Sequence, residues 1–327
     1  MNKKGSGIGN KYMKMIIRQN ELGAIIPLAI MMVVVLFINP SFFGTANLID
    51  ILRTSSFIFL IAIPMTFLLT AGGMDLSNGS VLSLGGVVCA MLIQRGWPIL
   101  MAALAAILCG IAVGLLNGII IVKFKQPAFI TTLGTQYIVN GVALVLTNGQ
   151  AVTNLPDKFK YLGQYMVFGF IPIPIIYAVV AGVIGYIILN KSKFGRAISA
   201  IGGNPETAYL AGINVVTKRT IIFVSVSIMA ALTGIIYASR FSSGIPGAGT
   251  GIEMKIMAAV IIGGTSMSGG SGTIVGTAIG CVLISTITNF LILIGVASTS
   301  QMLIFGVILL FAIFIDKYRR QAIGGGQ

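Results

Sequence analysis

Long apolar segments recur along almost the whole chain, and they restrict the possible folds more than any other feature of the sequence. Between residues 22 and 316 only short polar intervals separate them, and none of these is as large as a soluble domain. Of the 327 residues, 56% are hydrophobic and 9% are charged, and the mean hydropathy is +1.01. Soluble globular proteins lie far from these values. The sequence therefore predicts an all-α integral membrane protein with one membrane domain.

A helix needs about 20 apolar residues to cross a bilayer, and somewhat fewer where it is tilted or broken. By this criterion the chain has ten candidate transmembrane helices. They are residues 22–38, 54–70, 79–94, 98–122, 127–147, 172–190, 219–239, 255–266, 272–294 and 298–316. Residues 1–21 form a basic N-terminus and residues 317–327 a C-terminal tail. No small-residue cleavage pattern follows the first apolar segment, so we expect it to remain as a span.

The distribution of lysine and arginine predicts the orientation in the membrane. With a cytoplasmic N-terminus, 15 of the 21 basic residues are cytoplasmic: Lys3, Lys4, Lys11, Lys14, Arg18, Lys123, Lys125, Lys191, Lys193, Arg196, Lys218, Arg219, Lys317, Arg319 and Arg320. The other six are Arg53, Arg95, Lys158, Lys160, Arg240 and Lys255. This asymmetry follows the positive-inside rule and predicts that both termini are cytoplasmic. Topology and contact with lipid head groups then explain the net charge of +14, and we expect no nucleic-acid partner.

The sequence contains no histidine, which argues against most enzymatic functions. A rhomboid-like protease with Ser271 as its nucleophile would need a histidine base. An aspartyl intramembrane protease would need two buried aspartates, and only Asp75 qualifies. Cys89, Cys109 and Cys281 lie inside apolar segments, as buried thiols do, rather than in a disulfide or metal pattern. We therefore expect no catalytic residue and no metal site.

Three polar intervals are candidate contact surfaces. Residues 147–171 and 240–255 are the longest extracytoplasmic intervals, and residues 191–219 are the largest cytoplasmic one. Within the cytoplasmic interval, Asn204 can cap a helix that Pro205 and Glu206 begin and that Gly212 ends in the left-handed conformation. The pattern predicts a short helix outside the bilayer. It is either an ordinary interfacial turn or a rigid contact for a cytoplasmic partner.

Several motifs resemble those of one transporter family. The stretch ETAYLAG (206–212) resembles the cytoplasmic loop that docks permeases of ATP-binding-cassette importers on their ATPase, with Glu206, Ala208 and Gly212 matching. Four longer segments resemble, in order, the characteristic segments of ribose-type simple-sugar permeases. They are AGGMDLSNGSVLSLGG (71–86), QPAFITTLGT (126–135), FGRAISAIGGNPETAYLAGIN (194–214) and VIIGGTSMSGGSGTIVGTAIG (260–280). The likeness covers nearly the whole chain. Asn78 departs from it, because the family more often has an apolar residue after DLS.

This resemblance implies a permease subunit of the inner (plasma) membrane that works as a dimer, with a second, identical permease subunit expected. The dimer would accept a monosaccharide from an extracytoplasmic sugar-binding protein and be driven by a cytoplasmic ATP-binding-cassette ATPase. No G-x-x-x-x-G-K-[ST] phosphate loop occurs in the sequence, so ATP and Mg²⁺ are expected on the ATPase chain and no cofactor in this one. The residues expected to couple to the ATPase are Asn204, Glu206, Ala208 and Gly212. The basic residues that are candidates for receptor docking are Lys158, Lys160, Arg240 and Lys255.

Asp75 lies between two apolar segments, and ionisable residues at membrane depth normally face a pore, a partner or an interface. In a structural interpretation, Asp75 accepts hydrogen bonds from Ser77 and from the amides of an unwound turn, and so caps the helix that begins near Ser77. In a functional interpretation, Asp75, Ser77, Asn78 and Ser80 line the translocation pathway and offer acceptors to sugar hydroxyls. The sequence leaves both interpretations open.

Two other transport mechanisms stay open as alternatives. A passive polyol channel would need paired half-helices, and Asn39-Pro40 and Asn204-Pro205 lie at a span end and in a loop. A secondary sugar transporter usually couples through several buried carboxylates or cation sites, for which Asp75 alone is little support. A requirement for hydrolysable ATP and for an ATPase separates the importer from both.

Overall fold

The computed structural model describes residues 22–297, 300–301, 303–308 and 310. The predicted basic N-terminus, the C-terminal tail and much of the predicted span 298–316 therefore lie outside the described residues, as do the lysines and arginines near both ends. The described part is a bundle of helices with one small β-hairpin. Among the described residues, nine of the ten predicted apolar segments coincide with a helix.

The elements follow one another in an order that matches the predicted segments closely. They are α2 (Leu22–Ile38), the 3-10 helix η1 (Pro40–Phe43), α3 (Thr45–Thr70), α4 (Asn78–Gln94), α5 (Ile99–Gly118), the π-helical turn η2 (Ile119–Lys123), α6 (Ala128–Thr147), α7 (Asp157–Gln164), β1 (Met166–Val167), β2 (Ile171–Pro172), α8 (Ile173–Lys191), α9 (Lys193–Gly203), α10 (Pro205–Leu210), α11 (Val215–Phe241), α12 (Ile252–Ile262) and α13 (Ile274–Leu293). Strands β1 and β2 are antiparallel, with Val167 opposite Ile171.

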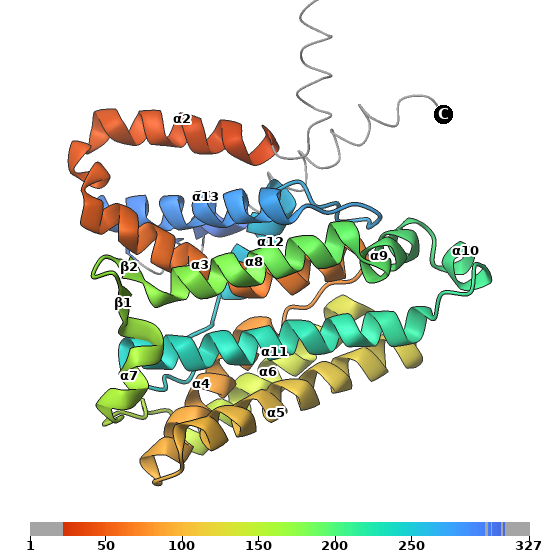
Figure 1. Cartoon of the computed structure of the whole chain (residues 1–327), viewed down its shortest axis with the longest axis horizontal. Helices are drawn as coiled ribbons and strands as arrows, with labels where there is room; N and C mark the ends of the chain where they lie inside the picture. The colour runs from red at the N-terminus through yellow and green to blue at the C-terminus, as the bar shows by residue number, and fades with distance from the viewer. Residues whose placement is uncertain (1–21, 298–299, 302, 309, 311–327) are drawn as a thin grey trace, which may run out of the picture.

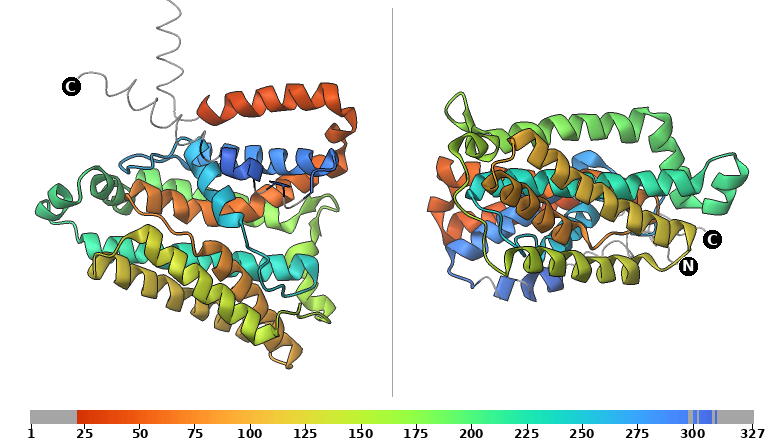
Figure 2. Two further views of the ribbon diagram at one scale, coloured as in Figure 1. Left: turned by 180° about the vertical axis from the view of Figure 1, so that it is seen from behind. Right: turned by 90° about the horizontal axis from the view of Figure 1, so that it is seen from below.

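The long helices lie side by side, and several short elements lie at the two ends of the bundle (Figure 1). Helices α9 and α10 project from one end, which we name the α10 end. Helix α7 and the β1–β2 hairpin lie at the opposite end, which we name the α7 end. Figure 2 shows α2 on one side of the bundle and α5 with α6 on the opposite side.

Six of the described helices are long and apolar enough to cross a membrane. They are α3, α5 with its π-helical extension, α6, α8, α11 and α13. Helices α2 and α4 are apolar but shorter, and α12 has only 11 residues. The structure therefore supports an all-α membrane protein with six full-length candidate spans, a smaller number than the ten predicted. Of the other four predicted spans, α2, α4 and α12 are shorter helices, and residues 298–316 lie largely outside the described part of the chain.

Helix α3 forms the centre of the bundle, and α5, α6 and α8 form its periphery. Most of α3 is buried, whereas most residues of the peripheral helices are not buried, and many of their exposed side chains are large and apolar, as expected for lipid contact. Helices α4 and α11 cross at very short range because Gly234 faces the carbonyl oxygen of Leu82, where any Cβ would collide with backbone. Such small residues let membrane helices approach closely. This packing fixes the positions of α4 and of the loops next to it.

Candidate functional site

The connection between α3 and α4 is an unwound segment that runs back into the bundle (Figure 1). Asp75 and Ser77 are fully buried in this segment, and Asn78 is fully buried at the start of α4. Asp75 Oδ1 accepts hydrogen bonds from Ser77 N at 2.7 Å and from Ser77 Oγ at 2.6 Å. Asn78 Nδ2 donates to the backbone oxygen of Asp75 at 2.7 Å, and Ser80 Oγ donates to that of Ser77 at 2.8 Å. The predicted hydrogen bond between Asp75 and Ser77 is therefore present.

The structure does not show the predicted capping of α4 by Asp75. Helix α4 begins at Asn78, and the side chain of its N-cap residue Ser77 makes no capping hydrogen bond. Asp75 binds the amide of Ser77 and none of the first-turn amides of α4 that the structure describes. Asp75 thus holds the turn that leads into α4 and does not cap the helix itself.

A chain of polar side chains extends from this turn across two more helices. Asn117 of α5 donates from Nδ2 to Ser77 Oγ at 2.9 Å, and Thr135 of α6 donates from Oγ1 to Asn117 Oδ1 at 2.7 Å. Both side chains are buried. Sequence reasoning missed both. Asn117 offered a signal, because it is an isolated polar residue in an apolar helix, whereas Thr135 is one of several polar residues of α6. We name Asp75, Ser77, Asn117 and Thr135 the polar relay.

A second unwound segment, residues 242–251, enters the bundle from the α7 end and meets the first turn of α4. The amide of Gly249 donates to Ser83 Oγ at 2.8 Å. Gly79 and Gly249 are in direct backbone contact, because a Cβ on either would collide with the carbonyl oxygen of the other. Non-helical backbone at membrane depth is tolerated only where it is buried in protein or lines a cavity. Two such segments therefore converge on the start of α4.

Glu253 is the residue that sequence reasoning missed most clearly. The predicted outer interval 240–255 is shorter in the structure, because α11 continues to Phe241 and α12 begins at Ile252. Glu253 consequently lies in the first turn of α12, buried to 5% exposure. Its Oε1 accepts hydrogen bonds from Gln136 Nε2 at 3.0 Å and from Gly251 N at 3.2 Å. Because Gln136 follows Thr135, α6 carries two adjacent contacts, one to the polar relay and one to Glu253.

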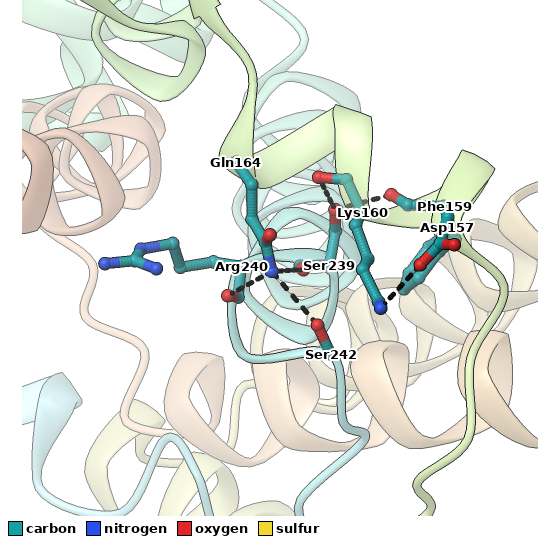
Figure 3. A network of polar contacts seen from close by, with 7 residues as sticks. All are labelled: Asp157, Phe159, Lys160, Gln164, Ser239, Arg240 and Ser242. Atoms are coloured by element: carbon teal, nitrogen blue, oxygen red, sulfur yellow. Dashed lines mark hydrogen bonds and ion pairs between the residues drawn. The ribbon is translucent and has the colours of Figure 1, made fainter.

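The α7 end carries three of the four predicted docking residues, and Figure 3 shows two of them, Lys160 and Arg240. Lys160 Nζ lies 2.6 Å from Asp157 Oδ1 on α7, and this contact holds the pKa of the Asp157 carboxyl below its usual value. Lys158 is exposed on the same helix. Arg240 lies at the end of α11, with its side chain pointing away from the Lys160 and Asp157 pair.

Helix α7 is fastened to the end of α11 by hydrogen bonds from side chains to backbone. Gln164 Nε2 donates to the backbone oxygen of Arg240 at 3.0 Å, and Ser239 Oγ donates to that of Phe159 at 2.6 Å. A crevice of about 450 Å³ opens beside α7. It is lined by Asp157, Lys160, Tyr161, Gln164, Tyr165 and Met166. The α7 end therefore presents a rigid surface that carries charged and aromatic side chains.

Lys255, the fourth predicted docking residue, does not lie on a loop at this end. It belongs to α12, and its Nζ lies 4.7 Å from the centre of the Phe305 ring. The sequence predicted Lys255 at the end of the outer interval 240–255, but α12 already begins at Ile252. The structure thus does not bring Lys255 together with Lys158, Lys160 and Arg240.

The predicted short helix at the α10 end is present, with the predicted cap. Asn204 Oδ1 accepts hydrogen bonds from the amides of Glu206 at 2.9 Å and Thr207 at 3.0 Å. Pro205 is the first residue of α10, and Gly212 has a φ of +83° in the left-handed region. Ala208 is buried, whereas Glu206 is exposed.

Two large apolar side chains of α10 project into the surroundings. Tyr209 is 71% exposed and Leu210 is 84% exposed. Helix α10 therefore presents a small apolar tip beyond the bundle.

The end of α3 is held by three contacts from the elements around α10. Arg219 of α11 donates from Nε and Nη2 to the backbone oxygen of Ala71, at 3.1 and 2.6 Å. The amide of Gly270 donates to the backbone oxygen of Thr70 at 2.8 Å. Gly202 of α9 packs so closely on Thr70 that a Cβ there would collide with it. These contacts, which we name the α3 clamp, lie a few residues from Asp75.

Comparison with known proteins agrees with this architecture. The ribose import permease protein RbsC of Bacillus subtilis is 39% identical over 299 residues, which is 91% of this chain and 92% of that protein. The Escherichia coli K12 L-arabinose transport system permease protein AraH is 36% identical, over 93% of this chain and 92% of its own length. The L-arabinose ABC transporter permease protein AraH of Azospirillum brasilense is 33% identical, over 92% of this chain and 88% of its own length. No solved structure matched the chain.

The family described as the permease component of branched-chain amino acid transport systems matches residues 47–313. This range includes both unwound segments, the polar relay, Glu253 and α10. The chain therefore belongs to this family of membrane transport permeases.

Proposed function

We propose that this chain is the membrane-spanning permease subunit of an ATP-driven importer that carries a monosaccharide across the inner (plasma) membrane. The observation that carries the proposal is the identity of 33–39% with ribose and arabinose permeases over at least nine-tenths of the chain. The family description refers to branched-chain amino acids, but these relatives are named for pentoses. The name of the Azospirillum relative, an ABC transporter permease, supports the importer over a passive channel or a secondary transporter.

Energy enters at the α10 end in this proposal. A cytoplasmic ATPase holds ATP and Mg²⁺, and the apolar tip of α10 fits a groove on it, with Asn204, Glu206, Ala208 and Gly212 giving α10 its shape. The cap at Asn204 and the exposure of Tyr209 and Leu210 support this role.

The sugar enters at the α7 end, where a binding protein delivers it. Lys158, Lys160 and Arg240 steer an acidic surface of that protein, because charges at the rim of an interface mainly accelerate association. Lys255 is part of the same proposal, although it lies in α12 and not at the α7 end with the other three residues. The partly exposed crevice beside α7 supports a contact at this end.

The complete assembly contains a second, identical permease subunit, ten spans in each copy and cytoplasmic termini. The charge asymmetry of the sequence supports the orientation. The pathway candidates Asp75, Ser77, Asn78 and Ser80 are buried in the single chain, which is consistent with a pathway in its closed state.

Uptake into vesicles tests the proposed function. The permease is reconstituted with the cassette ATPase and binding protein from its own genomic neighbourhood, and radiolabelled ribose, arabinose and leucine are supplied outside. We expect uptake of a pentose that requires the binding protein and hydrolysable ATP. Uptake of leucine, or pentose uptake without ATP, would contradict the proposal.

A further inference from the structure

Three buried oxygen atoms around the start of α4 have no hydrogen-bond partner among the described residues. They are Asp75 Oδ2, Asn78 Oδ1 and Glu253 Oε2. Their side chains are between 0% and 5% exposed. Buried acceptors are normally satisfied, because leaving one unpaired costs its full desolvation penalty. A set of unpaired acceptors in one place is therefore a feature to be explained by function.

Asp75 lies in the first unwound segment, Asn78 begins α4, and Glu253 lies in the first turn of α12, directly after the second unwound segment. Asn78 directly precedes Gly79, and Asp75 lies three residues before Asn78. Glu253 Oε2 lies so close to Gly79 that a Cβ there would be 2.5 Å from it. The second carboxylate is thus brought to the first turn of α4, beside the residues already considered as pathway candidates.

The surrounding hydrogen-bond donors are already used. Ser77 Oγ and N donate to Asp75, Asn117 Nδ2 donates to Ser77, and Gln136 Nε2 donates to Glu253. The unpaired atoms of the cluster are acceptors only, and two belong to carboxylates. Such a cluster suits a ligand with several O–H donors and disfavours an anionic group. A polyhydroxylated sugar matches this chemistry, whereas the carboxylate of an amino acid does not.

We infer that Glu253, together with Asp75 and Asn78, forms a binding site for sugar hydroxyls on the translocation pathway. This inference rests on the proposed function and adds to it a residue from the first turn of α12. The hydrogen bond from Gln136 to Glu253 joins α6 to α12 across the closed site. When the pathway opens, sugar hydroxyls donate to the oxygens that are unpaired in the closed state.

The variant Glu253→Gln tests the site. It keeps the size of the side chain but replaces a carboxylate oxygen with an amide donor. In the reconstituted complex we expect sugar uptake to fall by about tenfold or more, while ATP hydrolysis stimulated by the binding protein persists. The control is Ser285→Ala, which removes a buried, unpaired hydroxyl on α13, a helix that contributes no residue to the site, and should leave uptake unchanged.

A second variant separates sugar binding from a structural bridge. In Gln136→Glu/Glu253→Gln the amide and carboxylate exchange places, so the hydrogen bond between α6 and α12 is retained. We expect uptake to stay low in this exchange variant, because the carboxylate is now on α6. Uptake at the wild-type level in either variant would overturn the inference. Absence of ATP-dependent uptake by the unaltered permease would instead overturn the proposed function itself.

Discussion

Gly79 shows how a single residue type can set the geometry of the site. The second unwound segment touches the first turn of α4 at this position, where the space between Gly79 and Gly249 admits no side chain. The contact brings Ser83 within 2.8 Å of the Gly249 amide and Glu253 against the start of α4. A glycine here is required by close approach of backbone, since neither residue has a positive φ.

Substitution of Gly79 should therefore push the second unwound segment away from the start of α4. In Gly79→Ala the new methyl group meets the carbonyl oxygen of Gly249, and we expect a loss of about 1–3 kcal/mol in the free energy of unfolding. Gly134→Ala is the matched control, because a Cβ at that position on α6 meets nothing within 4 Å. Thermal unfolding in detergent measures both. Equal unfolding temperatures for the two variants would show that the backbones at Gly79 and Gly249 are not in tight contact.

Asp75 organises the turn before α4 through one carboxylate oxygen. In Asp75→Asn the amide oxygen can still accept from Ser77, so we expect normal insertion and reduced but measurable sugar uptake. Asp75→Leu should abolish uptake, because it leaves Ser77 without its acceptor at a cost of about 1–3 kcal/mol. Uptake is measured in vesicles between pH 6 and pH 8. A pH-dependent step that disappears only in Asp75→Asn would show that Asp75 carries a proton instead.

At the scale of elements, the α3 clamp connects the α10 end to the polar relay. Arg219 lies at the start of α11, shortly after α10 in the chain, and grips the backbone at Ala71. The unwound segment that contains Asp75 starts at that point. If helices α9, α10 and α11 moved as one rigid body, they would therefore displace the end of α3 and the turn at Asp75 together.

Arg219→Gln should weaken this connection without disturbing assembly. We expect the binding protein still to stimulate ATP hydrolysis, while sugar uptake falls by about tenfold because charged hydrogen bonds to Ala71 are lost. Arg219→Lys retains a charged donor and should restore part of the uptake. The control is Lys218→Gln, which removes the neighbouring charge whose Nζ lies over Phe194. An equal effect of both glutamine variants would assign the loss to charge alone.

Prediction from the sequence succeeded best for the apolar segments and for α10. Long apolar runs locate helices because burial of backbone in lipid requires internal hydrogen bonds, and Asn204, Pro205 and Gly212 act through local chemistry. The position of Glu253 could not be predicted, because nothing in 240–255 shows that α12 begins inside the bundle. The contacts of Asn117 with Ser77 and Thr135 depend on the packing of three helices, which local patterns do not encode.

At the scale of the whole molecule, the two ends of the bundle must face opposite sides of the membrane. We expect a reporter fused at Lys158, on α7, to lie outside the cell and one fused at Gly202, on α9, to lie in the cytoplasm. Alkaline phosphatase and green fluorescent protein fusions distinguish the two sides. If both sites report the same side, the proposed orientation is wrong.

The account as a whole claims that energy enters this chain through α10 and moves the unwound segments within it. In Glu206→Lys/Gly212→Val, a cation lies at the positive end of the α10 dipole and a β-branched residue is forced into a left-handed position, although no neighbouring atom blocks the side chain at 212. The most direct measurement is the rate of ATP hydrolysis in reconstituted vesicles, with and without the sugar-loaded binding protein, together with sugar uptake. We predict that the variant inserts and binds the sugar-loaded protein normally but loses stimulated hydrolysis and uptake together. Full stimulation in this double variant would contradict the account and would show that α10 is an ordinary interfacial turn.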